Sequence, residues 1–109
     1  MGKPSDLIQG TLDLLILRSI ATRPLHGWAI AKRIQTVSRE VLQVQQGSLY
    51  PALHRLEQQG YIEGVTRETE GGRTSRVYSL TSFGQEQLAK ETGQWERLSA
   101  AVRLVLEEA

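Results

Sequence analysis

The stretch QGSLYPALHRLEQQGY, residues 46–61, decides the fold of this chain. Apolar side chains recur in it at intervals of three and four residues, which predicts a helix with one buried face made of Leu49, Ala52, Leu53 and Leu56. The opposite face carries donors and an aromatic ring but almost no acid: Tyr50, Pro51, His54, Arg55 and Gln58. Such a face suits a nucleic-acid groove, although any amphipathic helix presents a polar face to solvent.

Both ends of this helix carry recognisable signals. Ser48 is a suitable N-cap, because its hydroxyl can accept a hydrogen bond from a backbone N–H of the first turn. Pro51 would then lie in the first turn, where a proline removes no intrahelical hydrogen bond. Gly60 supplies the left-handed residue that commonly ends a helix.

The composition is that of one folded domain. The chain has 109 residues, of which 39% are hydrophobic and 23% charged, so disorder is not expected. Cysteine is absent, which excludes disulfides and thiolate metal sites. No apolar run approaches the ~20 residues needed to cross a bilayer, and residues 1–6, MGKPSD, lack the features of a signal peptide. We expect a cytoplasmic protein with no membrane partner, and we interpret residues 1–6 as a polar lead-in.

The charge is unevenly distributed. The net charge of +1 indicates no partner by itself. Residues 1–80 contain ten Lys and Arg against seven Asp and Glu, whereas residues 81–109 contain three against five. This small asymmetry fits a mildly basic body followed by a C-terminal segment with a different role.

Two further helices precede the central stretch. Residues 10–21 are apolar around most of the circumference, which predicts a helix buried on more than one side and ended by Pro24. A second helix is expected from residue 26 to residue 37, with His26 as a polar starting residue and not a metal ligand. One face of it would hold Gly27, Ile30, Ala31, Ile34 and Val37. In the connection, residues 38–45, the pattern does not decide whether Val41, Leu42 and Val44 extend the helix or pack beneath the turn.

After Gly60 the pattern changes to that of strands. Residues 61–68 and 76–80 are rich in β-branched and aromatic side chains, and the turn-forming pair Gly71–Gly72 lies between them. The sequence therefore predicts a β-hairpin that carries Arg67, Arg73 and Arg76. These arginines suit contact with phosphates or a minor groove, or they keep a solvated edge strand from aggregating.

The last segment has the pattern of a long seam helix. Thr81 can cap a helix that continues nearly to the end of the chain, and two heptad registers recur in it, interrupted by Glu91: Leu88, Trp95, Leu98, Val102 and Val105. A single long helix in so small a protein has little of its own chain to pack against. We expect it to form a homodimer, while packing on the first helix of the same chain is the alternative.

Three helices followed by a hairpin define a winged helix-turn-helix. The predicted fold is therefore mainly α with a β-hairpin wing, plus one long C-terminal helix. We divide it into a DNA-binding domain, residues 1–80, and a dimerisation helix, residues 81–109. In this arrangement the third helix enters the major groove of double-stranded DNA, and a two-fold dimer reads a two-fold operator.

These residues resemble the PadR-type transcriptional regulators over nearly the whole chain. The similar segments are GTLDLLIL at 10–17, LHGWAI at 25–30, GSLYPALHRLE at 47–57 with Gly60, and GGRTSR at 71–76, followed by YSLT at 78–81 and Gly84. Tyrosine is more usual than Trp28 in this pattern. The short C-terminal part is similar to that of the small subfamily with a single dimerisation helix.

The resemblance implies a homodimeric repressor that is released from DNA by a small molecule, often phenolic or aromatic, or by a stress signal. The DNA-facing residues that it implies are Ser48, Tyr50, Pro51, His54, Arg55, Arg73 and Arg76. Lys32 and Arg33 of the second helix are further candidates for contact with the DNA backbone. Two Trp in a chain with few aromatics suggest a pocket for an aromatic effector, lined by Leu14, Trp28, Trp95 and Leu98. The alternative is that both Trp fill core and interface.

The sequence is less typical of two other classes of function. A winged helix can also serve as a protein–protein adaptor, but an adaptor has no need of an acid-poor recognition face. An enzyme is disfavoured, because the two His lie on different helices and Ser48 lacks a nucleophile motif. We therefore expect no catalytic residues, no metal and no cofactor.

Overall fold

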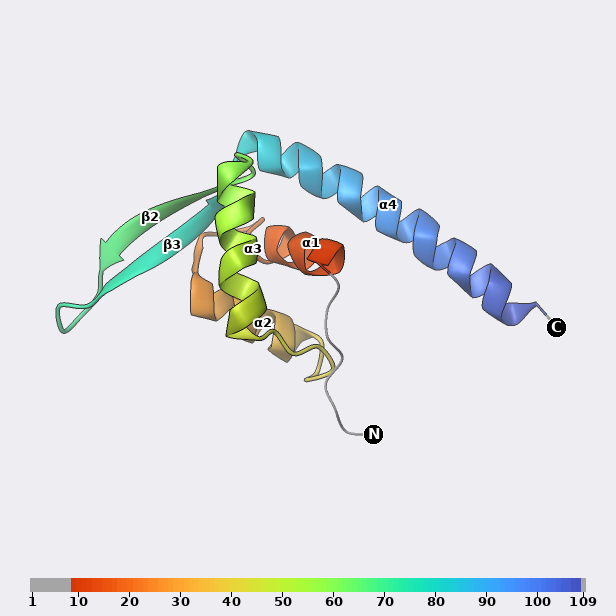
Figure 1. Ribbon diagram of the computed structural model, residues 1–109, viewed down its shortest axis with the longest axis horizontal. Helices are drawn as coiled ribbons and strands as arrows, with labels where there is room; N and C mark the ends of the chain where they lie inside the picture. Colours follow the sequence, from red (N-terminus) through yellow and green to blue (C-terminus); the bar gives the residue numbers. More distant parts are fainter. Residues whose placement is uncertain (1–8, 109) are drawn as a thin grey trace.

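The computed structural model describes residues 9–108 of the chain, so the expected lead-in at residues 1–6 lies outside the described residues. Its elements, in chain order, are α1 (Gln9–Ser19), β1 (Leu25–His26), α2 (Gly27–Val37), α3 (Gln46–Gln58), β2 (Ile62–Glu68), β3 (Thr74–Leu80) and α4 (Ser82–Glu107). Helices α1 to α3 form the body, from which the β2–β3 hairpin and α4 extend in opposite directions (Figure 1). The predicted fold class, a winged helix-turn-helix with one long final helix, is confirmed.

One hydrophobic core joins the three helices of the body to the base of the hairpin. The four apolar residues predicted for the central helix are all buried in α3. The whole cluster is Leu12, Ile16, Leu17, Ile20, Ile30, Ile34, Leu49, Ala52, Leu53, Leu56, Ile62 and Tyr78. Burial of each large aliphatic side chain contributes about 1.5–3 kcal/mol, so this cluster fixes the position of α3 in the body.

The start of α3 differs from the prediction. The N-cap is Gln45, not Ser48, and its carbonyl accepts from the backbone N–H groups of Ser48 and Leu49 at 3.0 and 2.9 Å. Pro51 consequently lies inside the helix and not in its first turn. A proline there has no backbone N–H and cannot donate to the carbonyl of Gly47, an exposed residue.

The end of α3 is as predicted. Gly60 has a left-handed backbone with φ +82°. The N–H of Tyr61 donates to the carbonyl of Leu56 at 3.1 Å, and the N–H of Gly60 donates to that of Glu57 at 3.0 Å. This pair of hydrogen bonds is a Schellman motif, which satisfies the last carbonyls of the helix and turns the chain into β2.

The structure resolves the connection between α2 and α3. Arg39 and Glu40 have left-handed backbones, with φ 55° and 67°, so α2 cannot continue. Leu42 and Val44 pack against the core beneath the turn, whereas Val41 is exposed. Val37, which was expected on the same face of α2 as Ile30 and Ile34, is 69% exposed, because the helix ends there and the chain turns away.

The sheet has a third strand that the sequence did not predict. The hairpin pairs β2 with β3 in register from Ile62 opposite Leu80 to Glu68 opposite Thr74. The two residues of β1 add to the other side of β3, giving the order β1-β3-β2. A strand of two residues is too short to show a period, so only the three-dimensional fold reveals it.

Helix α4 begins at a tight joint with the hairpin. As predicted, Thr81 is its N-cap, and its Oγ1 accepts from the N–H of Gly84 at 2.9 Å. A Cβ atom at Gly84 would lie 2.0 Å from the carbonyl oxygen of Tyr61, so only glycine fits this contact. Near this end α4 packs on α1, with Leu88 against the core.

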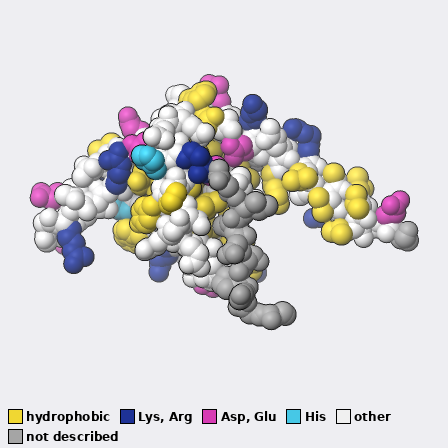
Figure 2. Space-filling view, in the orientation of Figure 1, with side chains coloured by type: hydrophobic (Ala, Val, Ile, Leu, Met, Phe, Trp, Pro, Cys, Tyr) yellow, Lys and Arg dark blue, Asp and Glu magenta, His cyan; other side chains and the backbone are white. Residues whose placement is uncertain are grey.

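The outer part of α4 extends beyond the body. Hydrophobic side chains gather on it in Figure 2, and those exposed to solvent are Trp95, Leu98, Val102, Leu104, Val105 and Leu106. The first half of the helix thus packs on α1, which was the alternative expectation, whereas the outer half presents an uncovered apolar surface and the homodimer stays a prediction. Among residues 9–108, no helix is long and apolar enough to cross a membrane.

Candidate nucleic-acid interface and effector hollow

The outer face of α3 is open to solvent. Ser48, Tyr50, Pro51 and His54 are exposed there, as the helical period predicts. The ring of Tyr50 lies against Gly27 at the start of α2, where an added Cβ would approach the Tyr50 Cε1 atom to 3.1 Å. Gly27 therefore allows α2 and α3 to approach each other and fixes the direction of the Tyr50 ring.

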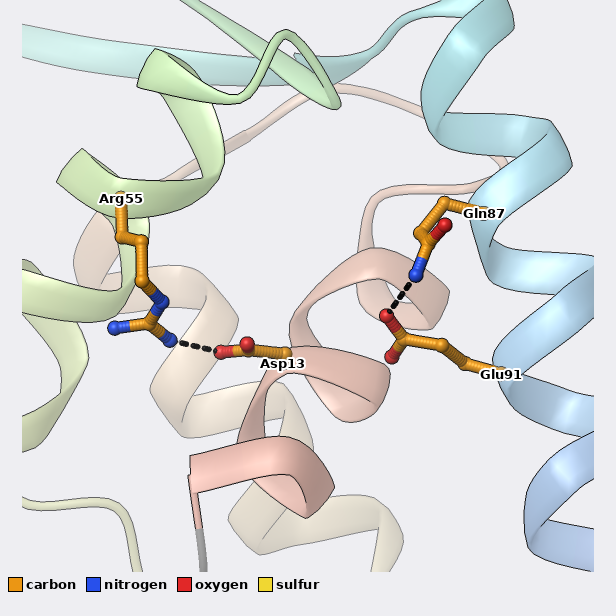
Figure 3. Close-up of polar contacts among 4 residues, drawn as sticks. All are labelled: Asp13, Arg55, Gln87 and Glu91. Atoms are coloured by element: carbon orange, nitrogen blue, oxygen red, sulfur yellow. Dashed lines mark hydrogen bonds and ion pairs between the residues drawn. The ribbon is translucent and has the colours of Figure 1, made fainter.

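Arg55 lies on the α1 side of this face and has a partner. Its Nη2 donates to Oδ1 of Asp13 on α1 at 2.5 Å, with side chains that are 30% and 15% exposed, respectively (Figure 3). Burial raises the pKa of Asp13, the Arg55 guanidinium opposes this rise, and the carboxylate of Glu91 on α4 adds to it. Arg55 was predicted from the sequence but Asp13 was not, because 42 residues separate the two.

Arg76 holds the wing against the other side of α3. Its Nη2 donates to Oε2 of Glu57 at 2.5 Å, and its Nη1 donates to Oγ1 of Thr66 at 3.2 Å. The hydrogen bond to Glu57 is the main cause that raises the pKa of Arg76. Gly64 provides the space, because an added Cβ would lie 2.5 Å from Nε of Arg76.

The wing and α3 together enclose a cleft. It is lined by Tyr50, His54, Glu57, Gln58, Arg76 and Tyr78. Three predicted DNA-binding residues, Tyr50, His54 and Arg76, are thus brought together on one concave surface. Burial raises the pKa of Tyr78 at its floor, although Arg76 opposes this rise.

The remaining predicted DNA-binding cations lie apart from this cleft. Arg73 is exposed at the tip of the hairpin, where the N–H of Thr69 donates to its carbonyl at 2.6 Å. Gly71 and Gly72 have left-handed backbones at φ +87° and +82°, which closes the tip. Lys32 and Arg33 are exposed on α2.

A second hollow, of about 430 Å³, lies between α1 and α4. It is lined by Gly10, Thr11, Leu14, Gln87, Glu91, Gln94, Trp95 and Leu98. Three of the four predicted pocket residues, Leu14, Trp95 and Leu98, therefore meet. Glu91 also lines this hollow, although it was not predicted there, and its Oε2 accepts from Nε2 of Gln87 at 2.7 Å (Figure 3).

Trp28 does not reach this hollow. It is 59% exposed and stacks on His26, with ring centroids 6.0 Å apart. It lines a different depression between α2 and α3, which Lys32 and Tyr50 also line. His26 is held at the edge of the sheet, with its Nδ1 2.7 Å from Oγ of Ser75. Within residues 9–108, no group of three metal-ligating side chains is clustered.

Comparison with known proteins identifies the family. The family model described as "Transcriptional regulator PadR-like family" matches residues 16–90. The chain belongs to the PadR-like family of transcriptional regulators. It is also 37% identical to the transcriptional regulator Rv3488 of Mycobacterium tuberculosis over 94 residues, which cover 86% of this chain and 84% of that protein.

Solved structures of PadR-like and other regulators have the same fold. A transcriptional regulator from Clostridium thermocellum, Cth-833, is 27% identical with a TM-score of 0.82, covering 91% of this chain and 96% of its own. The PadR-like regulator BC4206 of Bacillus cereus is 27% identical with a TM-score of 0.79, covering 96% and 100%. The resemblance read from the sequence is therefore correct, and the chain is a transcriptional regulator by family and fold.

Proposed function

We propose that this PadR-like regulator is a repressor that binds double-stranded DNA as a homodimer on a two-fold operator, and that a small molecule releases it. The observation that carries the proposal is the exposed outer face of α3, with the basic wing fastened beside it by Arg76 and Glu57. In a winged helix this face enters the major groove, and the wing contacts the adjacent backbone.

The proposed contacts follow from exposure and chemistry. The hydroxyls of Ser48 and Tyr50 suit phosphate oxygens, and His54 lies near the centre of the face, where base edges are reached. Arg73 at the wing tip, with Lys32 and Arg33 on α2, adds positive charge for the backbone. Arg55 and Arg76 are DNA-facing by position, but each is neutralised by a carboxylate of its own chain.

The proposed dimer uses the outer half of α4. Trp95, Leu98, Val102 and Val105 lie on one stripe of the helix and are 47%, 58%, 45% and 72% exposed. The predicted seam residue Leu88 lies further along the same stripe, where it is partly covered by the core of its own chain. A contiguous apolar stripe on a long helix is buried when a second copy packs along it.

The proposed effector site is the hollow between α1 and α4. Trp95 and Leu98 belong to both the hollow and the seam, so a second copy would complete the site. The indole offers a stacking surface for a flat aromatic molecule. Because Glu91 brings a carboxylate into the lining, we expect neutral or cationic guests to bind better than aromatic carboxylates.

The decisive experiment is selection of binding sites from random duplex DNA, with the mass of the bound protein measured alongside. A two-fold motif occupied by one dimer would support the proposal. Binding without a motif would indicate a non-specific DNA binder, and no binding at physiological salt would favour an adaptor.

A paired variant tests the assigned face. Replacing Tyr50 and Arg73 together by alanine should abolish operator binding while the dimer stays folded. Replacing Lys90 and Arg97 on α4 by alanine removes more positive charge away from the face, and it should leave affinity nearly unchanged. Equal affinity of the Tyr50/Arg73 variant and the parent would contradict the assignment.

A further inference from the structure

The ion pair between Asp13 and Arg55 lies on the border of the proposed DNA-binding face. On α3, Arg55 is one position from His54, at the centre of the exposed face, but its guanidinium is drawn towards α1. The pair is less exposed than the one between Arg76 and Glu57, whose side chains are 43% and 29% exposed. Solvent therefore screens the Asp13–Arg55 attraction less.

A guanidinium that is already paired with a carboxylate contributes less to the affinity for DNA. Each cation that neutralises a phosphate releases counterions, which makes binding salt-dependent. An Arg55 already paired with a carboxylate carries no net charge to the phosphate, so its contact releases little. Asp13 and a DNA phosphate are thus alternative partners for the same guanidinium.

The carboxyl group of Asp13 is held in a partly desolvated position beside Arg55. Burial of its carboxyl group opposes ionisation, and Arg55 only partly offsets this effect. A carboxylate whose desolvation is not fully compensated adds little to the stability of the fold. Its presence beside a recognition-helix arginine then calls for another role.

Building on the proposed function, we propose that Asp13 is a specificity-determining residue: it competes with DNA phosphate for Arg55 and thereby suppresses sequence-independent binding. On random DNA, the phosphate contact of Arg55 is too weak to displace Asp13. On an operator, base contacts of α3 bring the backbone close enough for the exchange. The gap between specific and non-specific affinity widens as a result.

The test is a double-mutant cycle on the full chain. Asp13→Asn, Arg55→Gln and the double variant are titrated with operator and with random duplex DNA over a range of salt concentrations. For Asp13→Asn we expect tighter binding to random DNA and a steeper dependence of log K on log salt, by about 0.9 per released arginine. The double variant should match Arg55→Gln, because Asp13 acts only through Arg55. Glu96→Gln removes an acid on the exposed surface of α4 and controls for the general change in charge.

Several outcomes would overturn the proposal. If Asp13→Asn weakens binding to both DNAs, Asp13 orients Arg55 towards DNA and does not compete for it. If Asp13→Asn and Glu96→Gln change affinity equally, only net charge matters. These failures differ from failure of the proposed function, in which the parent protein itself binds no duplex DNA.

Discussion

Asp13 on α1 and Arg55 on α3 are joined by a hydrogen bond of 2.5 Å from Nη2 to Oδ1 (Figure 3), and the next residue of α1, Leu14, lines the hollow between α1 and α4. Helix α1 therefore contacts both candidate sites, with Leu14 in the hollow and Asp13 at the face. The position of this helix links the two sites physically.

The stability of the fold should depend on pH through Asp13. Its pKa is raised above the ordinary value of 3.8, chiefly by burial. The folded protein then binds more protons than the unfolded chain between these two pKa values, so the free energy of unfolding should fall as pH rises through that window. Asp13→Asn should remove this dependence without lowering stability at pH 7. Urea unfolding between pH 4 and pH 7 measures it, and marked destabilisation by Asp13→Asn at pH 7 would contradict the expectation.

Glycine 84 should be the least replaceable residue at the start of α4. Gly84→Ala places a Cβ 2.0 Å from the carbonyl oxygen of Tyr61 and 2.7 Å from Cδ1 of Leu80. We expect a loss of about 1–3 kcal/mol or more in the free energy of unfolding, since backbone must move. Gly93→Ala is the matched control in the same helix, because its nearest contact would be Nη1 of Arg97 at 3.7 Å. That variant should gain about 0.5–1 kcal/mol from helix propensity. Equal changes in the free energy of unfolding at Gly84 and Gly93 would contradict the tight contact between Gly84 and Tyr61.

The wing should depend on Gly64. A Cβ there would lie 2.5 Å from Nε of Arg76 and 3.0 Å from Cε1 of Tyr78. The flexible arginine can move aside, so we expect a small change in stability but loss of the contact with Glu57. The hairpin should then show greater amplitude of motion by NMR relaxation and bind operator more weakly. Unaltered relaxation in Gly64→Ala would show that the ion pair does not restrain the wing.

The proposed dimer should be sensitive to one face of α4 only. Val102→Glu places a charge within the exposed stripe and should shift the mass in solution from dimer towards monomer. Leu104→Glu is its control: Leu104 is 71% exposed but lies about 200° around the helix from Val102. Sedimentation measures the oligomeric state of both variants. It therefore distinguishes association through one stripe of α4 from non-specific hydrophobic association of the whole helix. Dissociation by both, or by neither, would argue against the assigned stripe.

The effector proposal can be followed through fluorescence. In a Trp28→Phe variant all tryptophan emission comes from Trp95, because the chain has two tryptophans. Flat cationic or neutral aromatics should quench this emission, and matched aromatic carboxylates should do so less. The reciprocal Trp95→Phe variant should respond to neither group, since Trp28 lies outside the hollow. If only the emission of Trp28 were quenched, the binding site would lie in the depression between α2 and α3 and not in the hollow.

Local signals made much of this fold predictable. The buried face of α3 and its glycine stop depend on spacing within a few turns, as does the Thr81 cap of α4. The start of α3 was misassigned, because Ser48 has the chemistry of a cap but the chain already turns at Gln45. Sequence pattern does not report which elements meet, so the partners of Arg55 and Arg76 remained hidden. For the same reason, Trp28 was grouped with Trp95 although the two occupy different surfaces.

The contact of Gly84 with Tyr61 has a mechanical consequence for a dimer joined through α4. With no side chain between them, the backbone of Gly84 in the first turn of α4 lies directly against the backbone of Tyr61 at the base of the wing. The 26 residues of α4 span about 39 Å at ~1.5 Å per residue. The helix therefore converts a small rotation at its first turn into a larger displacement at its far end. A tilt of roughly 5° over that length displaces its far end by about 3 Å. Adjacent half-sites on DNA are about 34 Å apart. In the proposed dimer, a small molecule that changes the crossing angle of the two α4 helices would therefore change how well both winged helices fit one operator.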